Sequence, residues 1–149
     1  MERAGVTVEA ISGLYETAAV GRAGQAAYVN AAALIDTALP PEALLRLLKG
    51  IERRAGRRGG SHWGPRTLDI DILDYKGRVK HWHRLRPRFA RAGPRPLVLP
   101  HPWIETRPFV LRPLLDVAPD WRHPVTKRSV QALWREAALG REGQVMRKL

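Results

Sequence analysis

Residues 63–73 read WGPRTLDIDIL, and from Thr67 onward this stretch alternates polar and apolar side chains. Successive side chains of an extended chain point to opposite faces, so the alternation predicts a β-strand over 67–73. The strand would have one apolar face, formed by Leu68, Ile70 and Ile72, and a second face that carries Thr67, Asp69, Asp71 and Leu73. Burial of the apolar face would hold the strand rigidly, so that the side chains of the second face keep a fixed geometry.

The carboxylates of Asp69 and Asp71 are the strongest chemical signal in the chain. On a strand they point the same way, with their Cα atoms roughly 6.5 Å apart. Their mutual repulsion is costly unless a positive group lies between them. Two Mg²⁺ ions bound to the phosphates of a nucleotide would meet this need, since Mg²⁺ prefers few carboxylates plus phosphate oxygens. The alternative is a solvated strand face beside arginines.

Other segments have weaker periodicity. Residues 5–15 contain β-branched residues in partial alternation and predict a strand. The alanine-rich run 26–39 favours a helix by propensity, although alternation would place Tyr28 and Asn30 on one strand face. Pro40, Pro41 and Glu42 predict the start of a helix that ends at Gly56.

The second half of the chain is less regular. Residues 80–96 are basic, contain prolines and predict a long loop. A short helix is expected around 129–138, with Ser129 as its N-cap. The last ten residues are polar and are expected to fray.

Several further side chains are candidates for a site, each with a plainer alternative. Arg66 would clamp a phosphoryl group through its planar donors, or form an ion pair with the nearby carboxylates. Arg57 and Trp63 lie on a glycine-rich stretch that would close over a ligand, or are surface and core residues. Tyr28 with Asn30 suits a heteroaromatic ring, but a core tyrosine is the commoner case. A lone histidine such as His101 is more often structural than catalytic.

Composition narrows the class of protein. The 149 residues are enough for one domain, there are no cysteines, and the net charge is +12. Eight of the 26 Lys and Arg lie between Lys76 and Arg95, a stretch without Asp or Glu. The charge predicts an anionic partner: nucleic acid, a membrane surface or a phosphorylated small molecule. No membrane span or signal peptide is recognisable, so the cytoplasm is the expected compartment.

Taken together, these segments resemble the family of 6-hydroxymethyl-7,8-dihydropterin pyrophosphokinases of folate biosynthesis. The stretch WGPRTLDIDIL is similar to the signature of that family, and the similarity spans roughly residues 12–135. Further matching blocks occur in the same order: Tyr15-Glu16-Thr17, Val20-Gly21, Tyr28-Val29-Asn30-Ala31-Ala32, Glu52 with Gly56-Arg57, Pro100-His101-Pro102, Arg107-Pro108-Phe109 and Leu111-Arg112-Pro113-Leu114.

The resemblance implies an α+β, ferredoxin-like fold in which helices pack on an antiparallel sheet, and it implies that 26–37 is extended rather than helical. It also implies a single pterin pyrophosphokinase-like domain over 1–149 with a basic insertion at about 78–96. The activity implied is transfer of pyrophosphate from ATP to the hydroxymethyl group of the pterin, with release of AMP.

The resemblance also assigns residues to roles. Asp69 and Asp71 would hold two Mg²⁺ ions, and Arg57 and Arg66 would act in the transition state. The residues that would bind the pterin are Thr17, Val20, Tyr28, Asn30 and Phe109. Those that would bind ATP are Glu52, Trp63, Arg66, Ile72, His101 and Arg107.

The chain departs from the family at several points. The usual opening strand and helix have no counterpart ahead of the first match, so a shortened fold is expected, with a homodimer covering the exposed sheet edge. The basic segment is longer than usual, and Lys49 stands where a polar uncharged residue is frequent. These departures leave two alternatives: an impaired or altered-specificity homologue that binds a pterin or nucleotide, and a nucleic-acid-binding module.

Overall fold

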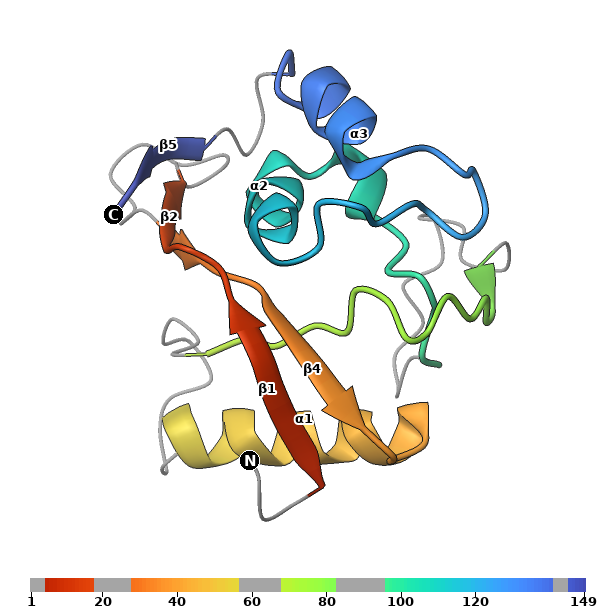
Figure 1. Cartoon of the computed structure of the whole chain (residues 1–149). Coiled ribbons are helices and arrows are strands. Elements are labelled where there is room, and N and C mark those ends of the chain that lie inside the picture. Colours follow the sequence, from red (N-terminus) through yellow and green to blue (C-terminus); the bar gives the residue numbers. More distant parts are fainter. Residues whose placement is uncertain (1–4, 18–27, 57–67, 83–95, 141–144) are drawn as a thin grey trace. The chain divides into compact units, whose positions relative to one another are not determined.

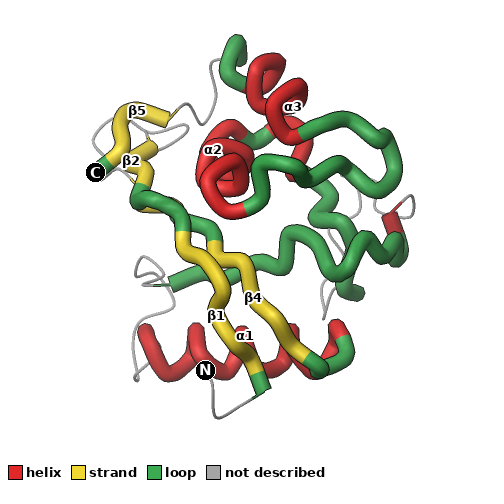
Figure 2. The backbone as a smooth tube through the Cα atoms, in the orientation of Figure 1, coloured by secondary structure: helices red, strands yellow, loops and turns green. Residues whose placement is uncertain are grey.

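The computed structural model describes residues 5–17, 28–56, 68–82, 96–140 and 145–149. Contacts within the chain divide it into two compact units, one formed by Met1–Ala38 with Pro102–Leu149 and the other by Leu39–His101. We call them the strand unit and the helix α1 unit. The whole chain is drawn in Figure 1, and Figure 2 colours the same view by secondary structure.

Two small antiparallel sheets build the strand unit. Strand β1 (Val6–Ile11) pairs with β4 (Ala33–Thr37), and β2 (Tyr15–Thr17) lies between β3 (Tyr28–Asn30) and β5 (Val145–Lys148). Figure 1 shows β1 and β4 side by side, with β1 leading into β2. The register of β2 and β3 matters for the site, because it sets Tyr15 opposite Asn30 and Thr17 opposite Tyr28.

Helices α2 (Pro108–Val117) and α3 (Val130–Ala137) complete the strand unit, after a short 3-10 turn, η3 (Ile104–Thr106). Pro108 occupies the first position of α2, where its missing N–H costs nothing. Ser129 caps α3 by accepting a hydrogen bond from the Ala132 N–H at 3.2 Å, as predicted. Helix α2 packs against α3 and contacts strands of both sheets. The core of the strand unit contains five apolar side chains that are at most 7% exposed: Ile104, Leu111, Leu114, Val130 and Leu133.

Helix α1 (Pro41–Gly56) dominates the second unit and has the predicted bounds. Its buried side chains Leu44 and Leu48 are one turn apart, so they lie on one face. The segment 68–75 contributes Ile72 and Tyr75 to the core of this unit, and 98–99 contributes Val98 and Leu99. The chain reverses after Tyr75, where Lys76 and Gly77 both have positive φ and the Arg78 N–H donates to the Tyr75 carbonyl at 2.9 Å.

The predicted α+β class with antiparallel strands is confirmed. The propensity-based helix over 26–39 is wrong: within the described residues this run forms β3 and β4, as the resemblance implied. Pairing with β2 and β1 outweighs the helical propensity of alanine, since tertiary context routinely overrides propensity. The expected fraying of the last ten residues is wrong for 145–148, which form β5 and pair with β2, whereas 141–144 lie outside the described residues.

The predicted strand over 67–73 is wrong in its hydrogen bonding and only partly right in its faces, because Leu68, predicted for the buried face, is 40% exposed. Among the described residues no ladder pairs with 68–73, and this segment is extended without being a strand. Ile72 is nevertheless buried while Asp69 and Asp71 are exposed. Alternation specifies which side is apolar, whereas a ladder also requires a neighbouring strand in register.

Candidate functional site

Asp69 and Asp71 lie on the solvent side of the extended segment 68–73. Their side chains are 54% and 49% exposed, whereas Ile72, the residue after Asp71, is buried with 9% exposed. Both carboxylates therefore face solvent beside a buried Ile72, as the alternation predicted, whereas Leu68 is exposed and Ile70 is half-buried. Two exposed acidic side chains on one rigid edge can bind a cation.

Glu52 of helix α1 fixes this segment in place. Its Oε1 accepts a hydrogen bond at 2.5 Å from the backbone N–H of Ile70, the residue between the two aspartates. The same oxygen accepts from Lys49 Nζ at 3.1 Å. Burial by itself raises the pKa of Glu52, but the Ile70 N–H and the Lys49 ammonium lower the pKa more, so it lies below its ordinary value. Glu52 is thus charged at neutral pH and anchors the aspartate segment to the helix.

Two basic side chains lie near the aspartates without closing on them. Lys49 Nζ is 4.0 Å from Asp69 Oδ1, and His101 Nε2 is 3.8 Å from Asp71 Oδ2. Both separations exceed hydrogen-bonding distance. His101 is itself positioned by its backbone N–H, which donates to the Leu73 carbonyl at 2.8 Å. The helix α1 unit therefore brings together Glu52, Asp69, Asp71 and His101.

The donor set suits an ion that brings further ligands with it. No group of three or more His, Asp or Glu that could hold a metal occurs within the described ranges. Mg²⁺ typically takes only one or two carboxylates and completes its octahedron with water and substrate phosphates. Asp69 and Asp71 fit this type of ion.

The strand unit brings together three of the residues predicted to bind the pterin. Asn30 Nδ2 donates to Thr17 Oγ1 at 3.0 Å, and Thr17 Oγ1 donates to the Tyr28 carbonyl at 3.4 Å. Thr17 is 2% exposed, whereas the Tyr28 side chain is 58% exposed. A buried hydroxyl bonded to a half-buried amide, beside an exposed aromatic ring, can orient and cover a flat heterocycle.

Arg107 and Phe109 lie at the start of helix α2. Arg107 is its N-cap residue, and the guanidinium carbon is 5.7 Å from the centre of the Phe109 ring, a cation–π distance. Phe109 is half-buried. The ring is therefore held partly by a cation and leaves part of its surface accessible.

The remaining predicted residues are placed differently. Ile72 is buried in the core of its unit. Its contact with ATP stays a prediction. Val20, Arg57, Trp63 and Arg66 lie outside the described residues, as does most of the basic segment 78–96.

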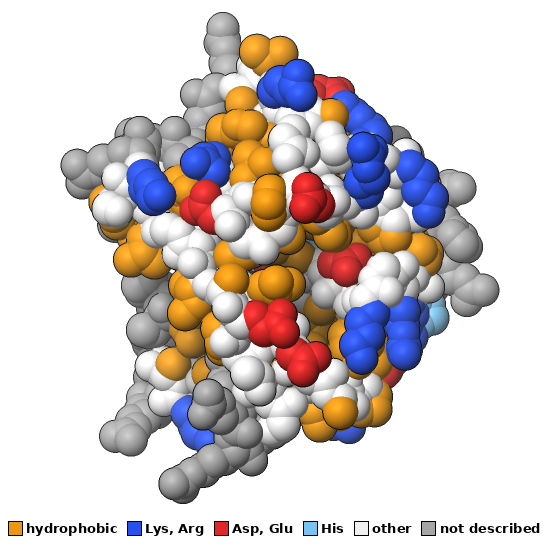
Figure 3. Space-filling model, in the orientation of Figure 1, with side chains coloured by type: hydrophobic (Ala, Val, Ile, Leu, Met, Phe, Trp, Pro, Cys, Tyr) orange, Lys and Arg blue, Asp and Glu red, His pale blue; other side chains and the backbone are white. Residues whose placement is uncertain are grey.

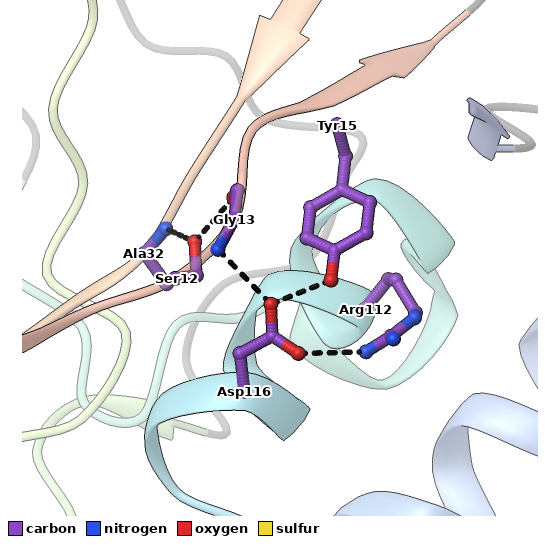
Figure 4. A network of polar contacts seen from close by, with 6 residues as sticks. All are labelled: Ser12, Gly13, Tyr15, Ala32, Arg112 and Asp116. Carbon is purple, nitrogen blue, oxygen red and sulfur yellow. Dashed lines mark hydrogen bonds and ion pairs between the residues drawn. The ribbon is translucent and has the colours of Figure 1, made fainter. Parts of the chain in front are cut away.

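Sequence reasoning missed a network around Asp116, in the last turn of helix α2 (Figure 4). Asp116 Oδ2 accepts hydrogen bonds from the Tyr15 hydroxyl at 2.5 Å and from the Gly13 N–H at 3.0 Å, while Oδ1 accepts from Arg112 Nη1 at 3.1 Å. Arg112 also lies over the Tyr15 ring, at 5.0 Å. The i,i+4 spacing of Arg112 and Asp116 is visible in the sequence. The contact with Tyr15 is not, because 101 residues separate the two.

The network shifts the titration of both partners. Burial and the hydrogen bond to Asp116 raise the pKa of Tyr15 above its ordinary value. Burial alone raises the pKa of Asp116, but the three donors lower the pKa more, so Asp116 is a carboxylate at neutral pH.

Basic side chains are dispersed on the face drawn in Figure 3, where Lys and Arg lie among acidic and apolar side chains.

No helix in the described part of the chain is long and apolar enough to cross a membrane.

Comparison with known proteins identifies the family. The family model described as 7,8-dihydro-6-hydroxymethylpterin-pyrophosphokinase matches residues 1–119. Three curated relatives carry the name 2-amino-4-hydroxy-6-hydroxymethyldihydropteridine pyrophosphokinase. The Synechocystis protein is 37% identical over 85% of this chain and 58% of its own length. The Aquifex aeolicus protein is 35% identical over 83% of this chain and 70% of its own length. The Pseudomonas aeruginosa protein is 41% identical over 77% of this chain and 64% of its own length.

The chain thus spans less than two thirds of two of these three relatives. The matched residues nevertheless include both aspartates, Glu52, His101 and the start of helix α2. The chain belongs to the 7,8-dihydro-6-hydroxymethylpterin-pyrophosphokinase family.

Proposed function

We propose that this protein transfers pyrophosphate from ATP to the hydroxymethyl group of 6-hydroxymethyl-7,8-dihydropterin and releases AMP. The observation that carries the proposal is the pair of exposed carboxylates, Asp69 and Asp71, anchored to helix α1 by the bond between Glu52 and the Ile70 N–H. The family membership and the printed names of the relatives support it.

In this proposal Asp69 and Asp71 hold two Mg²⁺ ions together with the phosphate oxygens of ATP. The ions would neutralise charge on the phosphates as the pyrophosphoryl group moves. The two carboxylates supply the fixed, outward-facing part of the coordination, and the buried Ile72 keeps them from turning inward. Glu52 holds the backbone between them at a constant position.

The phosphates and the nucleotide are bound by cationic and neighbouring side chains. His101, held by its backbone bond to Leu73, contacts a phosphate, and Arg107 contacts another. The resemblance adds Trp63, Ile72 and Glu52 as nucleotide contacts, and Arg57 and Arg66 as the arginines that stabilise the transition state.

The pterin ring lies between Tyr28 and Phe109. The exposed ring of Tyr28 supports a stacking contact, and the Thr17–Asn30 pair recognises the polar edge of the heterocycle. Val20 contributes to the same edge. Stacking and edge recognition together orient the hydroxymethyl group, which is most of what this reaction demands of the acceptor.

In the chemical step the hydroxymethyl oxygen forms a bond to the β-phosphorus of ATP, and the bond from that phosphorus to the α–β bridging oxygen breaks. AMP leaves with the bridging oxygen, and the hydroxyl proton is released. Alignment and charge neutralisation account for most catalysis of this kind.

The test is an assay of AMP release with ATP, Mg²⁺ and 6-hydroxymethyl-7,8-dihydropterin. We expect AMP and the pterin pyrophosphate to form in equal amounts, and no AMP to form without either the pterin or Mg²⁺. Binding of both substrates without AMP would contradict the proposal and favour the impaired homologue. Release of ADP instead of AMP would contradict the assigned bond cleavage.

We further propose that the protein forms a homodimer. Exposed apolar side chains on the strand unit, Ile11 at 71% and Leu14 at 50%, support an apolar contact there. Light scattering that gives the mass of a monomer at 100 μM would contradict it.

A further inference from the structure

The carboxylate of Asp116 has no part in the site described above, yet it joins the two elements that carry the pterin residues. It lies on helix α2, which carries Phe109 in its first turn, and it accepts hydrogen bonds from Tyr15, the first residue of β2, and from Gly13, two residues before it. Figure 4 shows Asp116 between the helix and the strand, with the Tyr15 hydroxyl and the Gly13 N–H both directed at it.

Phe109 and Asp116 occupy the same face of helix α2. They are seven residues apart, which is about two turns, and Arg112 lies between them on that face. A bond made by Asp116 to a neighbouring strand therefore fixes the rotation of α2 about its axis, and with it the direction in which Phe109 projects.

On the strand side, the bonded residue is directly opposite a pterin residue. Tyr15 pairs in register with Asn30, and two residues further along β2, Thr17 pairs with Tyr28. The bond from Asn30 to Thr17 links these two pairs. The Tyr15 hydroxyl thus connects Asp116 to the strands that hold Thr17, Tyr28 and Asn30.

We propose that Asp116 is a positioning residue for the pterin: through Tyr15 and Gly13 it sets helix α2 against β2 and β3, and so sets Phe109 relative to Tyr28 and Asn30. The inference rests on the proposed function, because it assigns these residues to a pterin site. Contacts of α2 with both β2 and β3 support it.

A purely structural network would stabilise the fold without affecting pterin binding. The test therefore compares the pterin affinity of variants in the network with that of a control variant destabilised elsewhere. The probe is 6-hydroxymethylpterin, titrated by fluorescence well below the unfolding temperature. The variants are Tyr15→Phe, Asp116→Ala and the double variant. The control is Val130→Ala, which removes packing from a fully buried position of helix α3.

We expect Tyr15→Phe to raise the dissociation constant of the pterin about fivefold, the worth of one hydrogen bond, and Asp116→Ala to raise it about tenfold or more. The double variant should match Asp116→Ala within a factor of about two, because the hydroxyl acts only through the carboxylate. Val130→Ala should lower the unfolding temperature and leave the pterin dissociation constant unchanged.

The outcomes separate the two proposals. A wild-type chain that does not bind the pterin overturns the proposed function, and this inference with it. If the wild type binds while Tyr15→Phe and Asp116→Ala stay within twofold of it, only the positioning role is overturned. Equal losses in Val130→Ala and Asp116→Ala also overturn it, since general destabilisation would then explain both. Tyr15→Phe removes a single oxygen and gives the answer even if Asp116→Ala does not fold.

Discussion

The Asp116 side chain accepts hydrogen bonds from three donors and is 22% exposed, whereas the side chains of Asp69 and Asp71 are 54% and 49% exposed. Lys49 and His101 approach the latter pair only to 4.0 and 3.8 Å. The carboxylate of Asp116 has three hydrogen-bond donors supplied by the fold. About half of each side-chain surface of Asp69 and Asp71 faces solvent and is accessible to a ligand.

This difference separates two uses of the same chemical group. A carboxylate that is bonded to a tyrosine hydroxyl, a backbone N–H and an arginine stabilises the folded chain and is costly to remove. Two carboxylates on one exposed edge repel each other and contribute little to folding until a cation binds. Substitutions at the two places should therefore affect different properties.

The largest effect should come from Asp69→Ala or Asp71→Ala. We expect AMP release to fall at least about 1,000-fold in each variant, because the ions lose a fixed ligand. The free energy of unfolding should change by less than about 1 kcal/mol, as at most exposed positions. Asp36→Ala, which removes an exposed carboxylate from β4, is the control for activity. Near-normal turnover in both variants would show that the Asp69–Asp71 pair is not needed for catalysis.

Asp116→Ala should show the opposite pattern. We expect urea denaturation to report a loss of about 2–3 kcal/mol, because the Tyr15 hydroxyl and the Gly13 N–H lose their acceptor. Turnover at saturating pterin should be retained within about fivefold, since no reacting atom is touched. A variant as stable as the wild type would show that solvent replaces the carboxylate at no cost.

The same residue predicts a dependence on pH. The pKa of Asp116 is lower in the folded chain than its ordinary value, so its contribution is present above the unfolded pKa and is lost as the pH falls through the folded pKa. The stability difference between the wild type and Asp116→Ala should therefore be constant from pH 7 to about pH 5 and shrink below about pH 4. A difference that grows in acid would have the wrong sign. Thermal melts at these pH values measure it.

Substitutions of Glu52 should affect both stability and turnover, because its carboxylate is hydrogen-bonded within the fold and supports the exposed pair Asp69 and Asp71. Glu52→Gln keeps an acceptor for the Ile70 N–H and should cost about 1 kcal/mol, whereas Glu52→Ala removes the acceptor and should cost about 2 kcal/mol. Turnover should decrease in the same order. Equal turnover in both variants would show that the bond to Ile70 does not position the aspartates.

The sequence was informative where local chemistry decides the outcome. The proline start and glycine end of α1, the Ser129 cap and the outward direction of Asp69 and Asp71 follow from short-range rules. The assignment of β3 and β4 as strands follows from the family resemblance, because alanine propensity favours a helix there and the alternation of Tyr28 and Asn30 alone does not decide. The bond from Tyr15 to Asp116 joins residues 101 positions apart, and no local pattern encodes it.

The smallest effect should come from Lys49, the basic residue of helix α1 that lies near Asp69. Its ammonium is 4.0 Å from Asp69 and 44% exposed, so solvent screens its charge. We expect Lys49→Gln to raise the affinity for Mn²⁺ about two- to fivefold in a titration followed by EPR, because one repulsive charge is removed at a screened distance. Arg46→Gln, at an exposed position one turn earlier on α1, is the matched control and should change nothing. A Mn²⁺ affinity that falls in Lys49→Gln would mean that the ammonium orders Asp69 more than it opposes the ion.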